Sequence, residues 1–290
     1  MDYFEMIQRV LDYIEMNLND KVSLERISEA ACFSPYHFHR IFKAMAGESV
    51  GEYMRRRRLS EASKKLLETS ERIIDIALEF QFESQESFTR AFKKVFKTTP
   101  GRYRSTGRAL VEFERAKLNV NFLKNVKGVK AMEPKIVVKK EFKVVGMRGQ
   151  TCLKNNVIPK MWENFFPRMG EIINRINKDT AYGICECSDI GETQFNDETL
   201  FNELVCVEVD RFDAIPKAMV CKTIPEQKYA VFTHRGPLYN LRQTYDYIYK
   251  TWIPTSGYQM AFKDDFELYD GRFKGIDDPG SEFDIYVPIK

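Results

Sequence analysis

The sequence contains one ten-residue pattern twice, as SPYHFHRIFK at residues 34–43 and as SQESFTRAFK at residues 84–93. Ser, Phe, Arg, Phe and Lys occupy the same five places in both copies. The correspondence continues beyond the pattern, since Gly51 and Tyr53 are matched fifty residues later by glycine and tyrosine. A repeat of this kind predicts that a whole structural unit is duplicated.

Each copy has the pattern of two short helices separated by a tight break. Apolar residues recur at helical spacing in residues 24–31, and a helix cap at Ser34 follows. The second copy repeats this order with residues 73–80, a break at 81–83 and a cap at Ser84. Helix, tight break, helix is the helix-turn-helix pattern.

Two further helices are predicted around the copies. Residues 4–14 have the apolar spacing of an amphipathic helix, and residues 53–67 read as one continuous helix between the copies. This second helix carries four consecutive arginines, 55–58. Because four adjacent residues point in every direction around a helix, we expect some of them to pack or to pair with acids, and one or two to reach phosphate.

The outward faces of the two predicted recognition helices suit base edges in the major groove. These faces comprise Tyr36, His39 and Arg40 in the first copy, and Gln85, Glu86, Ser87, Thr89 and Arg90 in the second. Arginine suits guanine, glutamine suits adenine, and glutamate can accept from cytosine. The alternative is that the two arginines are ordinary solvated charges. Because the two copies are in register, we favour DNA binding. The expected site is asymmetric, with two major-groove segments about one helical turn, roughly 34 Å, apart.

Residues 5–104 resemble the AraC/XylS family of bacterial transcription regulators. The resemblance is carried by RL at 58–59, IIDIA at 73–77, FESQ at 82–85 and TPGRYR at 99–104. It implies base contacts at the positions named above, RNA polymerase as a partner, and an activator rather than a repressor. The family usually has glycine in each break, where this chain has Cys32 and Gln81. Since a positive φ costs a residue with a side chain roughly 1–2 kcal/mol, we expect slightly different turns.

The C-terminal part shows a fainter duplication of strand-like and helical segments. Residues 144–149 resemble residues 230–236, and an interval of 87 relates Arg148 to Arg235 and Tyr182 to Tyr269. The predicted elements that follow are helices at 159–176 and 238–253 and closing strands at 203–209 and 282–289. Two strand-helix-strand-strand halves side by side, with a groove between them, are therefore expected.

The predicted fold class is multidomain. An all-α domain with two helix-turn-helix motifs is expected at residues 1–107, a linker at 108–132, and an α+β domain of duplicated strand-helix-strand-strand halves at 133–290. A length of 290 residues fits two domains, because single cores rarely grow beyond roughly 250–300 residues.

Residues 133–290 resemble the GyrI-like effector-binding domain. The carrying segments are YAVFTHRGP at 229–237, WIPTSGY at 252–258, FELY at 266–269 and FDIYVPI at 283–289. The resemblance implies a pocket for small, often aromatic and cationic molecules, with Glu267 as its central acid. We predict a ligand box of Trp162, Tyr182, Glu267 and Tyr269, because a carboxylate among aromatic rings attracts an organic cation. The alternatives are that the aromatic residues are core and that Glu267 points outward.

The remaining composition sets limits on function. The net charge of +3 is too small to indicate a nucleic-acid binder by itself, and the absence of a long apolar run or signal sequence predicts a cytoplasmic protein without membrane contact. The six cysteines are scattered and predicted to be reduced, and neither a metal nor a cofactor is predicted. We expect no enzyme activity; the alternatives are a ligand-degrading hydrolase that uses Glu267 and a protein-sequestering module.

Overall fold

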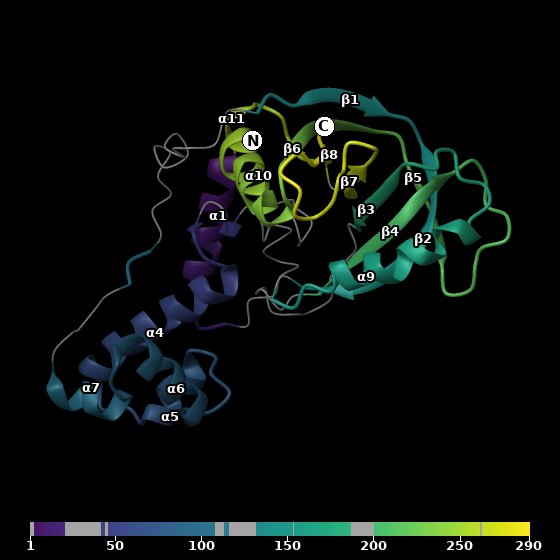
Figure 1. The fold of residues 1–290 in the computed structure, drawn as a ribbon. Coiled ribbons are helices and arrows are strands. Elements are labelled where there is room, and N and C mark those ends of the chain that lie inside the picture. Colours follow the sequence, from purple (N-terminus) through teal and green to yellow (C-terminus); the bar gives the residue numbers. More distant parts are fainter. Residues whose placement is uncertain are drawn as a thin grey trace. The chain divides into compact units, whose positions relative to one another are not determined.

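The computed structural model divides into two compact units (Figure 1). The structure describes residues 3–20, 42–43, 46–107, 113–115, 132–152, 154–186, 200–261 and 263–290. One unit holds the described residues up to Arg115 and the other holds those from Met132 onward. The domain limits at residues 107 and 133 stay predictions.

The N-terminal unit is helical throughout its described elements. These are α1 (Tyr3–Met16), α4 (Val50–Glu68), α5 (Ile73–Glu79), α6 (Gln85–Phe96) and α7 (Pro100–Thr106). The predicted opening helix, the long connecting helix and the second helix-turn-helix are confirmed as α1, α4 and α5–α6. The helices predicted for the first copy lie outside the described residues, apart from positions 42–43 at the end of the pattern.

The core of this unit fixes the orientation of α6. Phe88, Phe92 and Phe96 lie along one side of the helix and are buried. The Phe92 ring packs against Phe96 at a centroid distance of 4.4 Å and against Tyr103 of α7 at 5.3 Å. Because this apolar side is anchored in the core, the opposite side of α6 must face outward.

The four consecutive arginines of α4 divide as expected between structural and exposed roles. Arg57 is buried and donates from both Nε and Nη2 to the carboxylate of Glu15 at 2.8–3.1 Å. Arg58 donates to the carbonyl of Leu18 at 2.7 Å. Arg55 is exposed. The prediction that some of the run would pack or pair with acids is confirmed.

The turn between α5 and α6 differs from the expectation. Gln81 has φ 63°, so the left-handed geometry that usually takes glycine is retained, and the prediction of a changed turn is wrong at this residue. The turn closes through a hydrogen bond from the Phe82 amide to the Ala77 carbonyl (2.9 Å), while Gln81 Nε2 donates to the carbonyl of Asn19 (2.5 Å). These bonds hold the backbone of Gln81 in the left-handed region. Cys32, in the other predicted break, lies outside the described residues.

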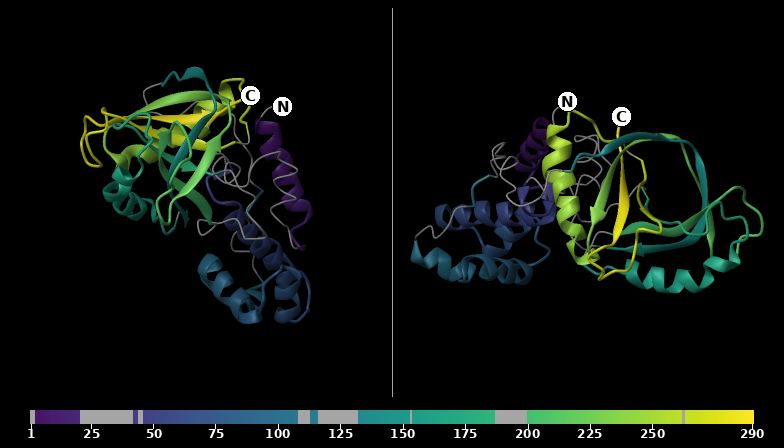
Figure 2. Two further views of the ribbon diagram at one scale, coloured as in Figure 1. Left: turned by 90° about the vertical axis from the view of Figure 1, so that its right-hand side faces the viewer. Right: turned by 45° about the horizontal axis from the view of Figure 1, so that its top comes forward.

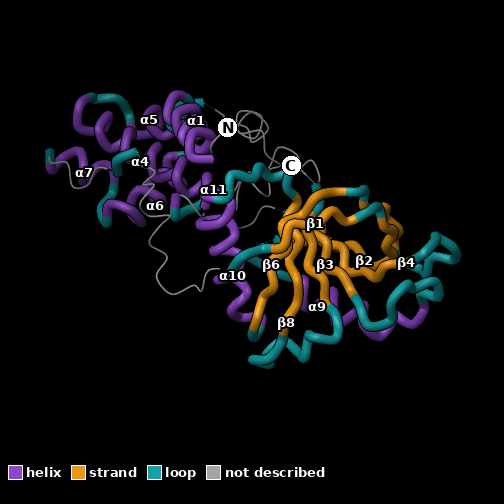
Figure 3. Tube along the Cα trace, turned by 90° about the horizontal axis from the view of Figure 1, so that it is seen from above, coloured by secondary structure: helices purple, strands orange, loops and turns teal. Residues whose placement is uncertain are grey.

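The C-terminal unit is built on one curled antiparallel sheet (Figure 3). The strand order is β1-β6-β8-β7-β3-β4-β2-β5. The bounds are β1 (Lys135–Lys139), β2 (Phe142–Thr151), β3 (Ala181–Cys185), β4 (Phe201–Val209), β5 (Val220–Ile224), β6 (Gln227–Arg235), β7 (Asp265–Tyr269) and β8 (Glu282–Pro288). Strands β2, β3 and β4 form one half, β6, β7 and β8 form the other, and the β3–β7 pair joins them. The predicted duplicated α+β fold is confirmed.

Each half carries one helical segment (Figure 2). The first comprises α9 (Ile158–Phe165) and a 3₁₀ turn, η1 (Phe166–Glu171), and the second runs through η2 (Leu238–Asn240), α10 (Leu241–Tyr247), η3 (Ile248–Trp252, π-helical) and α11 (Ile253–Thr255). The helix predicted over residues 159–176 is thus too long, because Pro167 cannot continue the α-helical hydrogen bonding. None of the described helices is both long and apolar enough to cross a membrane.

The two faces of the sheet bury different clusters. One face gathers residues from all the strands, among them Phe142, Tyr182 and Phe266. The other face packs against α9 through Val205, Val207 and neighbouring apolar residues. Which of these two faces a strand residue occupies decides whether it can reach the helices.

Candidate functional site

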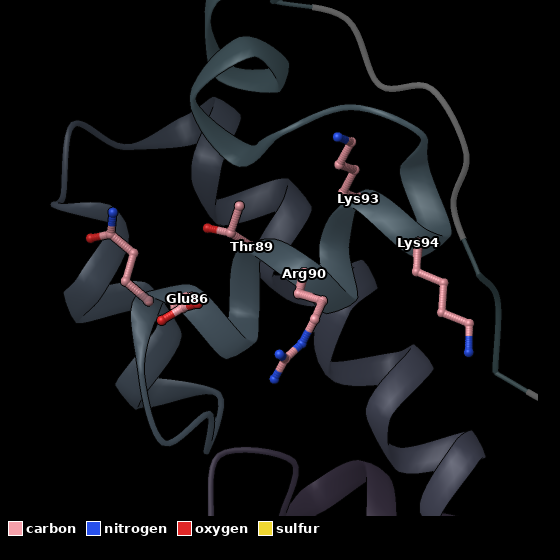
Figure 4. Close-up of a pocket in the computed structure, with 6 residues that line it drawn as sticks. Glu86, Thr89, Arg90, Lys93 and Lys94 are labelled. Atoms are coloured by element: carbon pink, nitrogen blue, oxygen red, sulfur yellow. The ribbon is translucent and has the colours of Figure 1, made fainter.

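The outward side of α6 brings together most of the residues predicted for the second DNA-reading head (Figure 4). An open pocket on this helix is lined by Gln85, Glu86, Thr89, Arg90, Lys93 and Lys94. The two lysines were not assigned by the sequence argument, although they stand three and four residues after Arg90 and so continue the same face. The resulting surface offers polar groups at the start of the helix and three cations toward its end.

Ser87 differs from the other predicted DNA-binding residues of α6 because its side chain caps the start of the helix. Its hydroxyl donates to the Ser84 carbonyl at 2.9 Å and accepts from the Ser84 amide at 3.3 Å, while the Ser84 hydroxyl accepts from the Ser87 amide at 3.1 Å. This reciprocal capping box defines the start of α6. The structure therefore engages Ser87 in holding the helix terminus. Tyr36, His39 and Arg40 of the first head lie outside the described residues.

Glu267 of β7 lies at the centre of an aromatic group in the C-terminal unit. The Tyr245 hydroxyl donates to Glu267 Oε1 at 2.7 Å, and the Tyr269 hydroxyl donates to Oε2 at 2.5 Å. The Trp162 ring of α9 packs edge-on against the Tyr269 ring, with 5.4 Å between centroids. Burial and the neighbouring Glu267 charge raise the pKa of Tyr269 well above its ordinary value, so its hydroxyl stays protonated and donates. Glu267 thus accepts two phenol hydrogen bonds beside an indole ring.

A second carboxylate reaches the same place. Gly183 faces Glu267 across the β3–β7 pair. A Cβ on Gly183 would lie 3.2 Å from Glu203 Oε1, 3.5 Å from Trp162 Cζ2 and 3.8 Å from Glu267 Oε2. Glu203 comes from β4 and is only 5% exposed. Two acids and one indole therefore meet above a residue without a side chain.

Sequence reasoning missed both Glu203 and Tyr245. Glu203 alternates with Val205 and Val207 on one face of its strand, and both valines are buried. An acid on the same strand face as two valines could have been recognised from the sequence as unusual. Glu267 was recognised in a similar way, from its position between Phe266 and Leu268. Tyr245 gave no comparable signal, because its helix contains several tyrosines.

The predicted placement of Tyr182 in the ligand box is wrong. Tyr182 pairs with Leu268, whereas Tyr269 pairs with Ala181, so the two tyrosines point to opposite faces of the sheet. Tyr182 is buried in the inner aromatic cluster, and its hydroxyl donates to Glu208 at 2.5 Å. The sequence repeat equated Tyr182 with Tyr269 at an interval of 87 residues, whereas Tyr182 pairs with Leu268. A difference of one residue along a strand places the side chain on the opposite face of the sheet.

His234 of β6 is a buried titratable group that is affected by the charge of Glu267. It is 1% exposed, and its Nδ1 lies 2.8 Å from the hydroxyl of Thr244. Burial lowers the pKa of His234, while the negative charge of Glu267 opposes this effect. The imidazole is therefore neutral near pH 7. Among the residues that the structure describes, no group of three or more His, Cys, Asp or Glu side chains is arranged to hold a metal ion.

The chain thus combines a helix-turn-helix that exposes a basic helix with a second domain that places an acid among aromatic rings. The family model described as "Integron-associated effector binding protein" matches residues 135–289, which is more than half of the chain. A helix-turn-helix domain model matches residues 27–106. The chain belongs to the Integron-associated effector binding protein family and carries an AraC-type helix-turn-helix domain ahead of the matched region.

Three regulators illustrate the similarity. The chain is 50% identical over 105 residues to the uncharacterized HTH-type transcriptional regulator YbfP of Bacillus subtilis, which is 36% of each chain. It is 35% identical over 161 residues to the transcriptional regulator BrlR of Pseudomonas aeruginosa, covering 56% of this chain and 57% of BrlR. It is 43% identical over 100 residues to the multiple antibiotic resistance protein MarA of Escherichia coli, covering 34% of this chain and 79% of MarA. The chain thus spans about a third of YbfP and just over half of BrlR.

Proposed function

We propose that this protein is a one-component transcription regulator that binds an asymmetric promoter site and responds to a small organic cation. The DNA-binding residues are Gln85, Glu86, Thr89 and Arg90 of α6, together with Tyr36, His39 and Arg40 of the first copy. Ser87 contributes by fixing the helix terminus. Activation through RNA polymerase is the expected mode, on the resemblance to AraC/XylS regulators.

The observation that carries the effector class is the environment of Glu267. Its carboxylate accepts hydrogen bonds from Tyr245 and Tyr269, and the Trp162 ring lies against Tyr269. A cation placed here gains both the carboxylate charge and the negative faces of the rings. A neutral molecule of the same shape gains neither attraction, because both depend on the positive charge, and keeps only van der Waals contact with the rings. The site therefore favours a cationic, partly apolar effector.

For a bound cation to change transcription, it must bind one state of the protein better than another. The affinity of the protein for DNA then changes by the same factor as its affinity for the cation, because the coupling is reciprocal. This holds whether the effector strengthens or weakens DNA binding.

The proposed DNA function is tested by enriching binding sites from a pool of random duplexes with the full chain. We expect one asymmetric motif with two different halves about one helical turn apart. The enriched duplex is then titrated with protein, with and without phenethylammonium, and a change in affinity is expected. A palindromic motif would contradict binding to an asymmetric site, and a DNA affinity that phenethylammonium leaves unchanged would contradict control by such a cation.

A hydrolase is the second candidate function. Glu267 alone would be weak support for catalysis, but Glu203 places a second acid near it. Two carboxyl groups near one point can divide the roles of general acid and general base toward a bound ligand. Product formation that Glu267→Gln and Glu203→Gln each abolish would favour the enzyme. Stoichiometric binding without product favours the sensor, which we adopt.

A further inference from the structure

The chain returns to the helical unit after α7 has ended at Thr106. Residues 113–115 lie in the stretch predicted to be linker, and they belong to the helical unit. The Phe113 ring packs against the core of this unit, with 5.9 Å between its centroid and that of Phe96 at the end of α6. The connection to the effector-binding unit is therefore attached to the core of the DNA-binding unit.

Helix α4 holds the backbone of Phe113 through both of its polar groups. The Phe113 amide donates to the hydroxyl oxygen of the buried Ser60 at 3.1 Å, and the Phe113 carbonyl accepts from Arg57 Nη1. The Arg56 guanidinium lies over the Phe113 ring, 5.2 Å from its centroid. Because both backbone groups have partners, this docked position is defined by hydrogen bonds as well as by apolar burial.

Arg115 extends the attachment to α1. Its guanidinium forms an ion pair with Asp12, although both side chains are partly exposed and the pair is weak by itself. Glu15 of α1 also binds Arg57, the residue that donates to the Phe113 carbonyl. With Phe113 on α4 and α6, the segment adds to the contacts that fix α1, α4 and α6 relative to one another.

We propose that Phe113–Arg115 act as a clasp: when docked, they hold the helices in the arrangement that binds DNA, and the effector-binding unit alters DNA affinity through their docking or release. This inference rests on the proposed function and adds the route by which the signal passes along the chain. The docked clasp favours DNA binding because helices that are already fixed lose less freedom when they bind. The state in which the clasp is released binds DNA more weakly.

The clasp contacts the buried side of α6. Phe96 is 5% exposed and lies among the phenylalanines of the core, whereas the proposed DNA-binding face of α6 is the outward one that carries Arg90. An effect of Phe113 on DNA affinity therefore reports the arrangement of the helices, and not a lost contact with a base or a phosphate.

The first test measures the affinity of Phe113→Ala and Ser60→Ala, each in the full chain, for the enriched duplex by fluorescence anisotropy. Each variant should bind about three- to tenfold more weakly, as expected for the loss of one hydrogen bond or apolar contact. Ser63→Ala is the matched control, because Ser63 is also buried in α4 and the variant also loses one hydrogen bond, to the Ser60 carbonyl at 2.7 Å. The control should bind within about twofold of the unaltered chain.

Thermal unfolding and the exchange rate of the Phe113 amide, followed by NMR, separate a clasp from a purely structural contact. A structural contact would lower the melting temperature and leave the DNA affinity of the folded protein unchanged, which would overturn the proposal. The clasp predicts faster exchange of the Phe113 amide in Ser60→Ala together with weaker DNA binding. If Phe113→Ala does not fold, the comparison of Ser60→Ala with Ser63→Ala still decides.

The second test adds phenethylammonium. Its effect on DNA affinity should fall to about twofold or less in Phe113→Ala, while calorimetry shows that both proteins bind the cation equally well. An equal effect on DNA affinity in both proteins would overturn the clasp as the route of the signal. If the cation does not bind the unaltered chain, the cationic-effector function fails, and the first test still decides whether the clasp sets DNA affinity.

Discussion

Gly183 of β3 and Glu267 of β7 face each other across the strand pair that joins the two halves of the sheet. This pairing places the acid beside the one position where the neighbouring strand has no side chain. Glu203 and Trp162 converge on the same position from β4 and α9. The candidate effector site is therefore assembled at the junction of the duplicated halves, from residues of both.

Trp162→Leu should weaken binding of an aromatic cation by about 1 kcal/mol, because the cation loses one ring face while both acids remain. The affinity is measured by calorimetry on the full chain. Trp252→Leu is the comparison, since Trp252 packs on Phe232 and Tyr258 instead. Equal losses in the two variants would contradict the assignment of Trp162 to the site.

Arg90→Ala should weaken binding to the enriched duplex by about 1–3 kcal/mol and relax base preference at one position. Lys94→Ala should weaken binding to all sequences alike and lower the salt slope, because a lysine contact to phosphate carries no base information. Fluorescence anisotropy at several salt concentrations distinguishes the two. Arg72→Ala is the control, since Arg72 is exposed and bound to Asp75 at 2.7 Å. Unchanged affinity in Arg90→Ala would refute the placement of α6 against DNA.

Gln81→Gly should be more stable than Gln81→Ala by about 1 kcal/mol, because only alanine pays for the positive φ of this turn. Both variants lose the side-chain bond to the Asn19 carbonyl, so their difference isolates the backbone term. Urea unfolding of the two variants measures it. A difference near zero would mean that the turn relaxes out of the left-handed region.

Stability should fall in acid in a way that depends on His234. Burial lowers the pKa of His234 below 6.5 in the folded protein, so the unfolded chain binds the proton more readily. The contribution of His234 is therefore complete above about pH 6.5 and is lost as the pH falls below that value. Between pH 7 and 5.5 the melting temperature of His234→Asn should drop less than that of the unaltered chain. Parallel pH profiles for the two proteins would contradict this assignment.

Much of the helical unit could be predicted from the sequence, because its signals are local. Ser84 as a cap and Phe88, Phe92 and Phe96 at helical spacing gave α6 and its outward face. The strained turn at Gln81 could not be predicted, because the Asn19 carbonyl that holds its side chain is more than sixty residues away.

The effector site was predictable only in part. Glu267 was singled out as an acid between two apolar residues, and in the structure the Tyr269 hydroxyl donates to it while Trp162 packs on the Tyr269 ring. Tyr182 was misplaced because strand register depends on pairing between the halves, and an internal repeat fixes such pairing only to within a residue or so. Glu203 reaches the site through the pairing of β4 with β3 within one half.

The most direct test of the account is the affinity of the full chain for phenethylammonium, compared with that of Glu267→Gln. Titration calorimetry at low salt measures both, with Glu282→Gln as a control acid that is bound to Arg235. Removing the charge should weaken binding by about tenfold or more, since a hydrogen bond to a charged group is worth roughly 1.5–3 kcal/mol. The control should bind as the unaltered chain does. Equal affinity in the unaltered chain and in Glu267→Gln would contradict the claim that this acid is the centre of a cation site.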